Sequence, residues 1–417
     1  MVHSLFPGQS ELYRQIEQDI RHTYTLITSS RYITNRHLEQ ISIDAKKRLA
    51  KWNSNQPWFY YLTYLHGVFS LSTQSYEEYE RRFSYFFHAM IEELVSFWDE
   101  MKERDDEQPF INHVALLLIH DASVPEAPWP DLLFQMTSHL EKELIETVYT
   151  TFSKAINPGN CSRQAALLYS YISLLAEKEM SSLSILIKNG KPYEEQEVGP
   201  HFQVLKDRDR WHTMKQWVHT LFSMRQNSYG SLQPYIDEMN AALSSQTETL
   251  AAIWDRWLLS PNYQRFLALI QHVPSAEQEK LLDRLLPRLE QKLDQLETAK
   301  TYEKLLLKYE KFELATHYLL TYELDPLRLR PEREELLTIL QEYSPHLARP
   351  IFHQFIVRLV EKKSRLHYEK AAMYLKALQT LYKQAEEDAL FFDYVTKLKK
   401  MYRTYRAFIE ELKQIDI

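Results

Sequence analysis

Apolar residues recur along almost the whole chain with the period of an α-helix, and no segment shows the convincing alternation of a strand. The pattern predicts early helices over residues 9–26, 35–53, 57–72 and 75–104. Ser75 and Glu78 have the spacing of a capping box at the start of the last of these helices. Its expected buried stripe consists of Tyr79, Phe83, Phe86, Met90, Leu94, Phe97 and Met101.

Three segments interrupt the helical pattern and predict domain boundaries or insertions. The stretch at 124–131 holds three prolines in eight residues, and NPGNCS at 157–162 and residues 188–202 form the other two breaks. Asn189-Gly190 reads as a helix C-cap rather than a hairpin turn, although residues 188–202 are the one place for a small β element. The predicted domains are an N-terminal helical subdomain (1–125), a middle one (126–203) and a C-terminal repeat domain (204–417).

Helix pairs of 30–40 residues follow from about residue 204, which is the size of an α-solenoid repeat. Residues 308–328 resemble the second half of a tetratricopeptide repeat: Ala315 is the small residue, and Asp325-Pro326 ends the helix. Tyr318 and Tyr322 would carry its apolar stripe. The simpler alternative is an ordinary antiparallel helical hairpin. The sequence therefore predicts an all-α, tetratricopeptide-like array of antiparallel helix pairs.

The chain is predicted to close on a pair of long helices, 367–387 and 390–415. The apolar stripe of the second helix consists of Val395, Leu398, Tyr402, Tyr405, Ile409 and Leu412. Its near-heptad spacing predicts a hairpin whose two helices pack lengthwise.

Composition narrows the fold and the setting. Only 6 of 417 residues are glycine, which argues against a nucleotide-binding α/β fold, since phosphate loops and strand–helix turns use positive φ. Cys161 is the single cysteine, so disulfides and cysteine-based zinc sites are excluded, and such usage fits the cytoplasm. We expect no signal peptide and no membrane-spanning segment.

Charge is distributed unevenly along the chain. The formal net charge is −7, yet residues 358–417 carry 13 Lys or Arg against 9 Asp or Glu. Five cations without an intervening acid lie in this basic tail: Lys397, Lys399, Lys400, Arg403 and Arg406. On one continuous helix they could line a phosphate backbone or contact a partner. The alternative is a solvated helix face with no binding role.

Motifs for catalysis are absent from the sequence. No phosphate-binding glycine loop, nucleophile elbow or H-E-x-x-H motif occurs. Asp19/His22 and Asp209/His212 have a metal-ligand spacing, but two such pairs are what chance predicts. Cys161 precedes a predicted helix N-terminus, so it is either a reactive thiol or a small residue near a cap. We therefore predict no catalytic, cofactor-binding or metal-binding residue, and no cofactor.

Tryptophans offer the best sequence signal for a protein-binding groove. The candidates are Trp58, Trp211, Trp217, Trp254 and Trp257. Tryptophan often carries much of the binding energy at an interface. The alternative for each is a place in the hydrophobic core.

The C-terminal stretch YEKAAMYLKALQTLYK, followed by a helix with YRAFIEELKQ, resembles the C-terminus of bacterial SWIM zinc-finger proteins. NQPWFYYLTYLHGVFSLS is similar to the aromatic helix that follows the finger in that family. The family's Cys-x-Cys…Cys-x-His is missing, so no zinc ligand carries over. The chain would be a finger-less relative, lack the finger at its coding start, or receive it from a partner. The resemblance implies a DNA-associated setting beside a Swi/Snf-type helicase-like ATPase.

Three functions follow from these features. The first is a non-enzymatic scaffold that binds a protein partner such as this ATPase. The second is a nucleic-acid-binding protein that uses the basic C-terminal helix. The third is a tetratricopeptide-type regulator that holds a peptide, although the later helices have few of the asparagines expected on its concave face. An enzyme ranks last, and neither the oligomeric state nor a small-molecule ligand is predicted.

Overall fold

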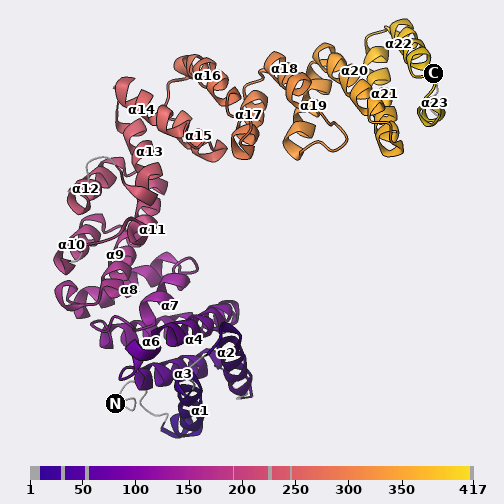
Figure 1. The fold of residues 1–417 in the computed structure, drawn as a ribbon. Coiled ribbons are helices and arrows are strands. Elements are labelled where there is room, and N and C mark those ends of the chain that lie inside the picture. Colours follow the sequence, from indigo (N-terminus) through magenta and orange to yellow (C-terminus); the bar gives the residue numbers. More distant parts are fainter. Residues whose placement is uncertain are drawn as a thin grey trace. The chain divides into compact units, whose positions relative to one another are not determined.

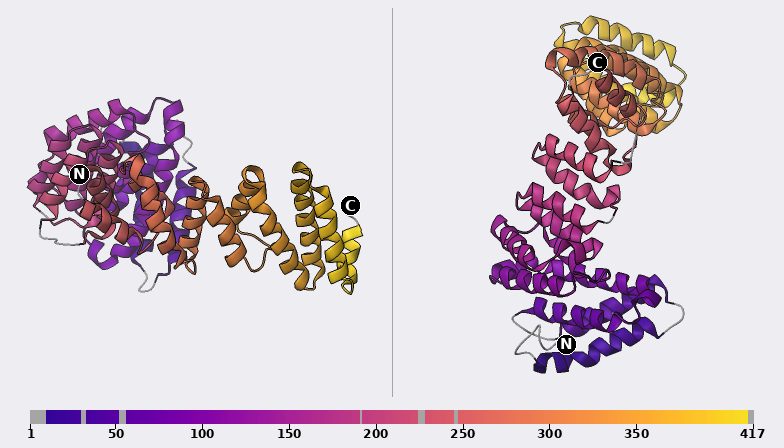
Figure 2. Two further views of the ribbon diagram at one scale, coloured as in Figure 1. Left: turned by 90° about the horizontal axis from the view of Figure 1, so that it is seen from above. Right: turned by 90° about the vertical axis from the view of Figure 1, so that its left-hand side faces the viewer.

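A computed structural model describes residues 10–29, 33–51, 56–190, 192–223, 228–244 and 247–413. Every regular element in these ranges is a helix, and they contain no strand (Figure 1). Figure 2 shows the same helical ribbons from two further sides. The predicted all-α fold class is therefore confirmed. None of the helices in these ranges combines the length and the apolar content needed to cross a bilayer.

The chain divides into two compact units, residues 1–239 and 240–417. The helices of the first unit follow the predicted order closely; residues 57–72, for example, form a helix with the predicted bounds. They are α1 (Ser10–Thr28), α2 (Asn35–Leu49), α3 (Pro57–Ser72), α4 (Tyr76–Ser96), α5 (Trp98–Glu103), α6 (Glu107–His120), α7 (Trp129–Met136), α8 (Lys142–Ala155), η2 (Pro158–Asn160), α9 (Arg163–Leu175), α10 (Glu179–Asn189), α11 (Glu195–Asp207), α12 (Trp211–Leu221) and η3 (Gly230–Leu232).

Helix α13 (Gln233–Leu243) contains the boundary between the units, and the second unit continues from there. Its further helices are α14 (Thr247–Trp257), α15 (Tyr263–Ile270), α16 (Ser275–Glu290), α17 (Leu296–Lys308), α18 (Phe312–Tyr322), α19 (Pro331–Tyr343), α20 (Pro345–Glu361), α21 (Arg365–Gln384), α22 (Asp388–Met401) and α23 (Arg406–Lys413). From α15 onward, the extensive contacts join each helix to the next one or the next but one. This order is compatible with stacked helix pairs; a tetratricopeptide-like geometry stays a prediction.

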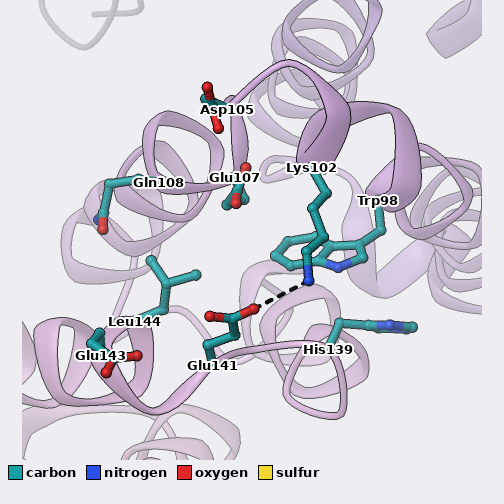
Figure 3. Close-up of a pocket in the computed structure, with 9 residues that line it drawn as sticks. All are labelled: Trp98, Lys102, Asp105, Glu107, Gln108, His139, Glu141, Glu143 and Leu144. Carbon is teal, nitrogen blue, oxygen red and sulfur yellow. Dashed lines mark hydrogen bonds and ion pairs between the residues drawn. The ribbon is translucent and has the colours of Figure 1, made fainter.

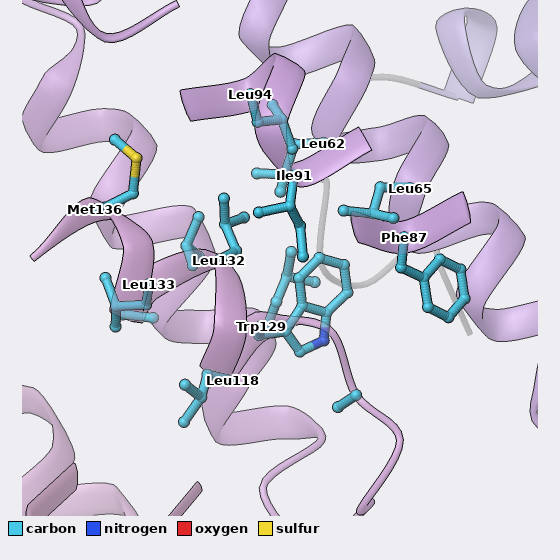
Figure 4. Packing of buried hydrophobic residues seen from close by; sticks show 14 of the residues in the cluster. Leu62, Leu65, Phe87, Ile91, Leu94, Leu118, Trp129, Leu132, Leu133 and Met136 are labelled. Carbon is cyan, nitrogen blue, oxygen red and sulfur yellow. The ribbon is translucent and has the colours of Figure 1, made fainter. Parts of the chain in front are cut away.

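The core of the first unit is built around Trp129, which is fully buried in the proline-rich stretch (Figure 4). Its ring packs against Phe69 and His66, with ring centroids 5.8 Å away in both cases. The indole Nε1 donates a hydrogen bond to Asp121 Oδ2 at 2.8 Å. One apolar cluster thus includes residues from both sides of position 125. The predicted boundaries at 125/126 and 203/204 stay predictions.

A buried polar network lies inside the second unit. The Glu303 side chain on α17 is fully buried, and its Oε1 accepts from Tyr318 Oη at 2.5 Å and from Arg333 Nε at 2.9 Å. Arg330 Nη2 donates to the same oxygen at 2.5 Å. Arg333 also pairs with Glu323, just beyond α18. The network therefore ties α17, α18 and α19 together through charge-assisted hydrogen bonds.

Many helices end in a left-handed residue that is not glycine. The φ angle lies between 50° and 62° at five such residues: Asp105, Glu177, Asp209, Glu310 and Glu386. After Glu310, the Lys311 N–H donates to the Leu306 carbonyl at 2.9 Å, and the other four sites show the same bond. This is the Schellman pattern, in which glycine is the usual left-handed residue. It explains how a glycine-poor chain ends its helices abruptly.

Several predicted helix boundaries were wrong. Ser75 does lie at the N-cap of α4, but the predicted capping box does not form, because its hydroxyl makes no capping bond and lies 3.0 Å from Tyr24 Oη. The predicted helix 75–104 ends at Ser96, where Phe97 adopts ψ −1° and packs edge-on against Tyr61. In contrast, Gly190 is a left-handed C-cap with φ 69°, which confirms the preferred interpretation of Asn189-Gly190. Residues 195–207 within and beyond the third break form α11 rather than a β element.

In the second unit, Ala315 and Tyr318 are buried as predicted, whereas Tyr322 is 39% exposed. The last predicted helix is broken into α22 and α23 by a turn at Tyr402. At the turn, the rings of Tyr402 and Tyr405 pack at a tilt of 44°, and Phe408 packs against Tyr368 on α21. These rings thus pack around a turn between two helices instead of lying on one uninterrupted helical stripe.

Candidate functional site

The basic tail is exposed but not continuous. Lys397, Lys399 and Lys400 lie on α22, Arg403 lies in the turn, and Arg406 begins α23. No ion pair or hydrogen bond joins these five side chains to any described residue. The break after Met401 means that they do not share one helix face, contrary to the sequence prediction. Lys399 and Lys400 occupy the last turn of α22, where cations also stabilise a helix dipole.

Four of the five candidate tryptophans are core residues. Trp58, Trp217, Trp254 and Trp257 are at most 3% exposed. Trp254 and Trp257, for example, pack against Phe266, with ring centroids 5.6 Å and 5.7 Å away. They are therefore not exposed anchors for a partner, because burial of their large apolar rings stabilises the fold. Trp211 is half-buried at the start of α12.

Cys161 is buried, with 6% of its surface exposed. Its thiol donates to the Pro158 carbonyl at 3.4 Å. The neighbouring Ser162 is the N-cap of α9 and accepts from Ala165 N at 3.2 Å. Of the two alternatives, burial favours a small residue next to a cap.

An open groove of about 530 Å³ lies between α7, α9 and α11 in the first unit. Its apolar surface includes the rings of Phe134 and Tyr171, whose centroids lie 5.2 Å apart. Phe134 remains 38% exposed. The groove is lined by Pro130, Asp131, Phe134, Gln164, Leu167, Leu168, Tyr171, Gln196, Glu197, Pro200 and His201. It presents uncovered aromatic surface on packed helices, which is the arrangement that binding surfaces use.

His201 forms part of the groove wall and is 2% exposed. Its ring lies between Tyr171 and Trp217, with centroid distances of 5.3 Å and 5.5 Å. Burial lowers the pKa of His201 to about 3, and the nearby Leu167 backbone opposes that shift. Neither ring nitrogen makes a hydrogen bond of standard geometry within the described part of the chain. The His201 imidazole is therefore uncharged at physiological pH and contributes a largely apolar ring to the lining of the groove.

Glu197 helps to begin α11 at this groove. Its Oε2 accepts from the Glu194 N–H at 2.7 Å, and it also pairs with Arg163 of α9. Pro200 lies inside the same helix. Because proline has no N–H, the carbonyl of Gln196 loses its usual helical donor. The α11 side of the groove thus carries a carboxylate that is already paired and a helical turn that lacks one backbone donor.

A second hollow of about 300 Å³ lies near α5, α6 and the start of α8 (Figure 3). Trp98 and His139 line it, and their rings lie 5.9 Å apart. Lys102 Nζ reaches across to Glu141 Oε1 at 3.1 Å. Further carboxylates come from Asp105, Glu107 and Glu143. Within the described ranges, no group of three or more His, Cys, Asp or Glu could hold a metal ion.

Comparisons with known proteins find one short similarity. Over 70 residues, the chain is 36% identical to YwqB of Bacillus subtilis (strain 168), described as an uncharacterized protein. The match covers 17% of this chain and only 13% of YwqB. No family model matches the chain, and no solved structure matches it. The resemblance to SWIM zinc-finger proteins therefore stays a prediction.

Sequence reasoning missed the groove. Its residues are dispersed between Pro130 and His201, on helices that meet only in the folded chain. The one local signal is Pro200 within a helical segment, which the sequence pattern placed in a loop.

Proposed function

We propose that this protein is a non-enzymatic helical scaffold that binds a protein partner in the cytoplasm. The observation that carries the proposal is the open groove between α7, α9 and α11, with its partly exposed Phe134. Open apolar grooves on packed helices suit protein segments better than they suit small molecules, which usually occupy more enclosed pockets. Stacked helix pairs in a solenoid would add an extended surface for the same partner.

The resemblance to SWIM zinc-finger proteins supports a partner that acts on DNA, such as a Swi/Snf-type helicase-like ATPase. The scaffold would hold this partner without contributing a catalytic group. A tetratricopeptide-type regulator is a narrower version of the same idea, in which the partner presents a peptide.

The test is a pull-down of the tagged full-length chain from cells that express it, with and without nuclease. We expect one protein to be retained in stoichiometric amount after nuclease treatment, and mass spectrometry would identify it. Capture that disappears with nuclease, or no capture at all, would overturn the scaffold proposal.

A second candidate function is direct nucleic-acid binding by the basic tail. Its five cations are exposed and have no ion-pair partner among the described residues. If four of these cations contact phosphates, raising the salt concentration from 50 to 200 mM should weaken the affinity for DNA by on the order of a hundredfold. Lys400→Glu and Arg403→Glu should each weaken the binding of labelled duplex DNA, measured by fluorescence anisotropy. Lys188→Glu, at an exposed lysine on α10, is the charge-matched control. Salt-insensitive binding, or an equal effect of the control, would exclude this function.

A further inference from the structure

The groove between α7, α9 and α11 continues into a neighbouring hollow. This neighbouring hollow, of about 190 Å³, is distinct from the one beside Trp98 and His139. It reaches α4 and shares Pro130, Asp131 and Gln164 with the groove. Tyr76, Phe87 and Ile91 contribute to its lining. We call the two hollows together the α4–α11 groove. The first hollow has the more apolar lining and the second the more polar one. Together they can accept an apolar side chain and a neighbouring polar or charged side chain of one extended or helical segment.

The charged side chains that line the α4–α11 groove, apart from His88 and His201, are carboxylates: Glu126, Asp131 and Glu197. The Asp131 side chain is 52% exposed, and its Oδ2 lies 3.9 Å from His88 Nδ1, an ion pair only when that histidine is protonated. Its Oδ1 accepts from Gln135 at 3.2 Å. Glu126 lies in the same hollow.

The cations of this region do not fully offset those carboxylates. Arg163 is adjacent to the groove, but its guanidinium already pairs with Glu197 and lies over the ring of Tyr193. A carboxylate that keeps half of its surface exposed beside an apolar floor favours a cationic ligand group over an anionic one.

We infer that the α4–α11 groove binds a segment of the partner protein in which an apolar side chain is adjacent to lysine or arginine. The apolar side chain packs on the aromatic surface of Phe134 and Tyr171. The neighbouring cation lies against Asp131. The inference rests on the proposed scaffold function and specifies the chemistry of the partner segment. Arginine suits the site particularly well, since its planar guanidinium can donate to a carboxylate and stack on an aromatic ring.

The test uses a phage-displayed library of random 12-residue peptides, selected on the immobilised full-length chain. Each enriched peptide is then measured by fluorescence anisotropy on two groove variants, Phe134→Ala and Asp131→Lys. Leu116→Ala removes an apolar side chain that is 52% exposed on α6, and Asp99→Lys reverses an exposed acid on α5. These two variants are the matched controls, and circular dichroism verifies that all four variants fold.

We expect enriched peptides to combine an aromatic or aliphatic residue with a neighbouring lysine or arginine. Their affinity should fall at least tenfold on both groove variants and less than twofold on both controls. The inference is overturned if no enriched peptide depends on Phe134 and Asp131, or if the dependent peptides are acidic. It is also overturned if the Asp99→Lys control weakens binding as much as Asp131→Lys does.

The pull-down separates this inference from the scaffold proposal. A partner that survives nuclease treatment and is still retained by the Phe134→Ala and Asp131→Lys chains contradicts the groove chemistry and leaves the scaffold intact. If the wild-type chain retains no partner, the scaffold proposal itself fails.

Discussion

His201 shows at the residue scale how burial changes a titratable group. The ring lies between two aromatic side chains, and its pKa falls to about 3 because the charged form would lose its hydration. In the unfolded chain the same imidazole has its ordinary pKa of about 6.5. Below that pH the unfolded chain therefore binds a proton that the folded chain does not, and the folded state loses relative stability as the pH falls towards about 3.

This difference predicts an acid-sensitive fold. Lowering the pH from 7.5 to 5.5 should cost about 1.4 kcal/mol of unfolding free energy through His201 alone. In His201→Phe, the fall between the two pH values should be smaller by roughly that amount. Urea unfolding followed by tryptophan fluorescence at both pH values measures it.

His66 provides the internal control for this comparison. Burial also lowers its pKa, to about 4, and it is present in both proteins, so its contribution cancels. An equal fall in unfolding free energy for the wild type and His201→Phe would show that His201 is protonated in the folded chain.

At the element scale, the Glu303 network links three helices through one carboxylate. Burial alone would lower the pKa of Arg333, but hydrogen bonds to Glu323 and Glu303 raise it, so the guanidinium stays charged. Burial also raises the pKa of Tyr318, and so do the hydrogen bond and charge of Glu303. The phenol is therefore the donor to Glu303. Removing the carboxylate charge would leave two arginines without their shared partner.

Glu303→Gln should consequently lower the free energy of unfolding of the second unit by about 3 kcal/mol. Glu297→Gln is the matched control, because its carboxylate is 68% exposed and pairs with Lys300 on the surface. That control should cost less than about 1 kcal/mol, as exposed pairs generally do. Urea unfolding of the full chain measures both, and equal effects would mean that the buried network contributes no more than a surface ion pair.

Helix ends give a second prediction at this scale. Glu310 is exposed and holds φ 50° at the end of α17, a conformation that glycine adopts without strain. Glu310→Gly should therefore raise stability by up to about 1 kcal/mol. Gly190→Ala should lower stability by a similar amount, because Gly190 has φ 69°, a conformation that strains alanine. Nothing lies within 4 Å of an added Cβ, so this loss would come from the backbone and not from a clash. Thermal unfolding compares the two, and a loss of stability in Glu310→Gly would contradict the account of these caps.

The sequence predicted helices better than it predicted their ends. The bounds of α3 follow from the 3.6-residue period and the proline at residue 57. The same period predicts the buried Phe83, Phe86, Met90 and Leu94 of α4, but Tyr79 and Phe97 of the predicted stripe are only partly buried. The break at Tyr402 does not follow from this period, because a side-chain contact across helices decides it. The Schellman ends have no sequence signal either, since Asp and Glu occupy the position where glycine would mark them.

On the scale of the whole molecule, the candidate binding surface could not be predicted from single residues. Four of the five tryptophans that suggested a partner groove belong to the core, since large apolar rings gain most from burial. The α4–α11 groove is instead lined by residues such as Phe134, Gln164 and Pro200, which lie on separate helices and form no motif in the sequence. The exposed cations of the basic tail were predicted correctly as exposed positions, but the turn at Tyr402 separates them.

The most direct test of the central claim, that the scaffold binds its partner in the α4–α11 groove, is site-specific photo-cross-linking in cells. Phe134→p-benzoylphenylalanine places the probe in the α4–α11 groove, and Leu116→p-benzoylphenylalanine places it on the exposed face of α6. The account predicts that one protein cross-links at position 134 and not at position 116. No adduct at position 134, or the same set of adducts at both positions, would contradict it.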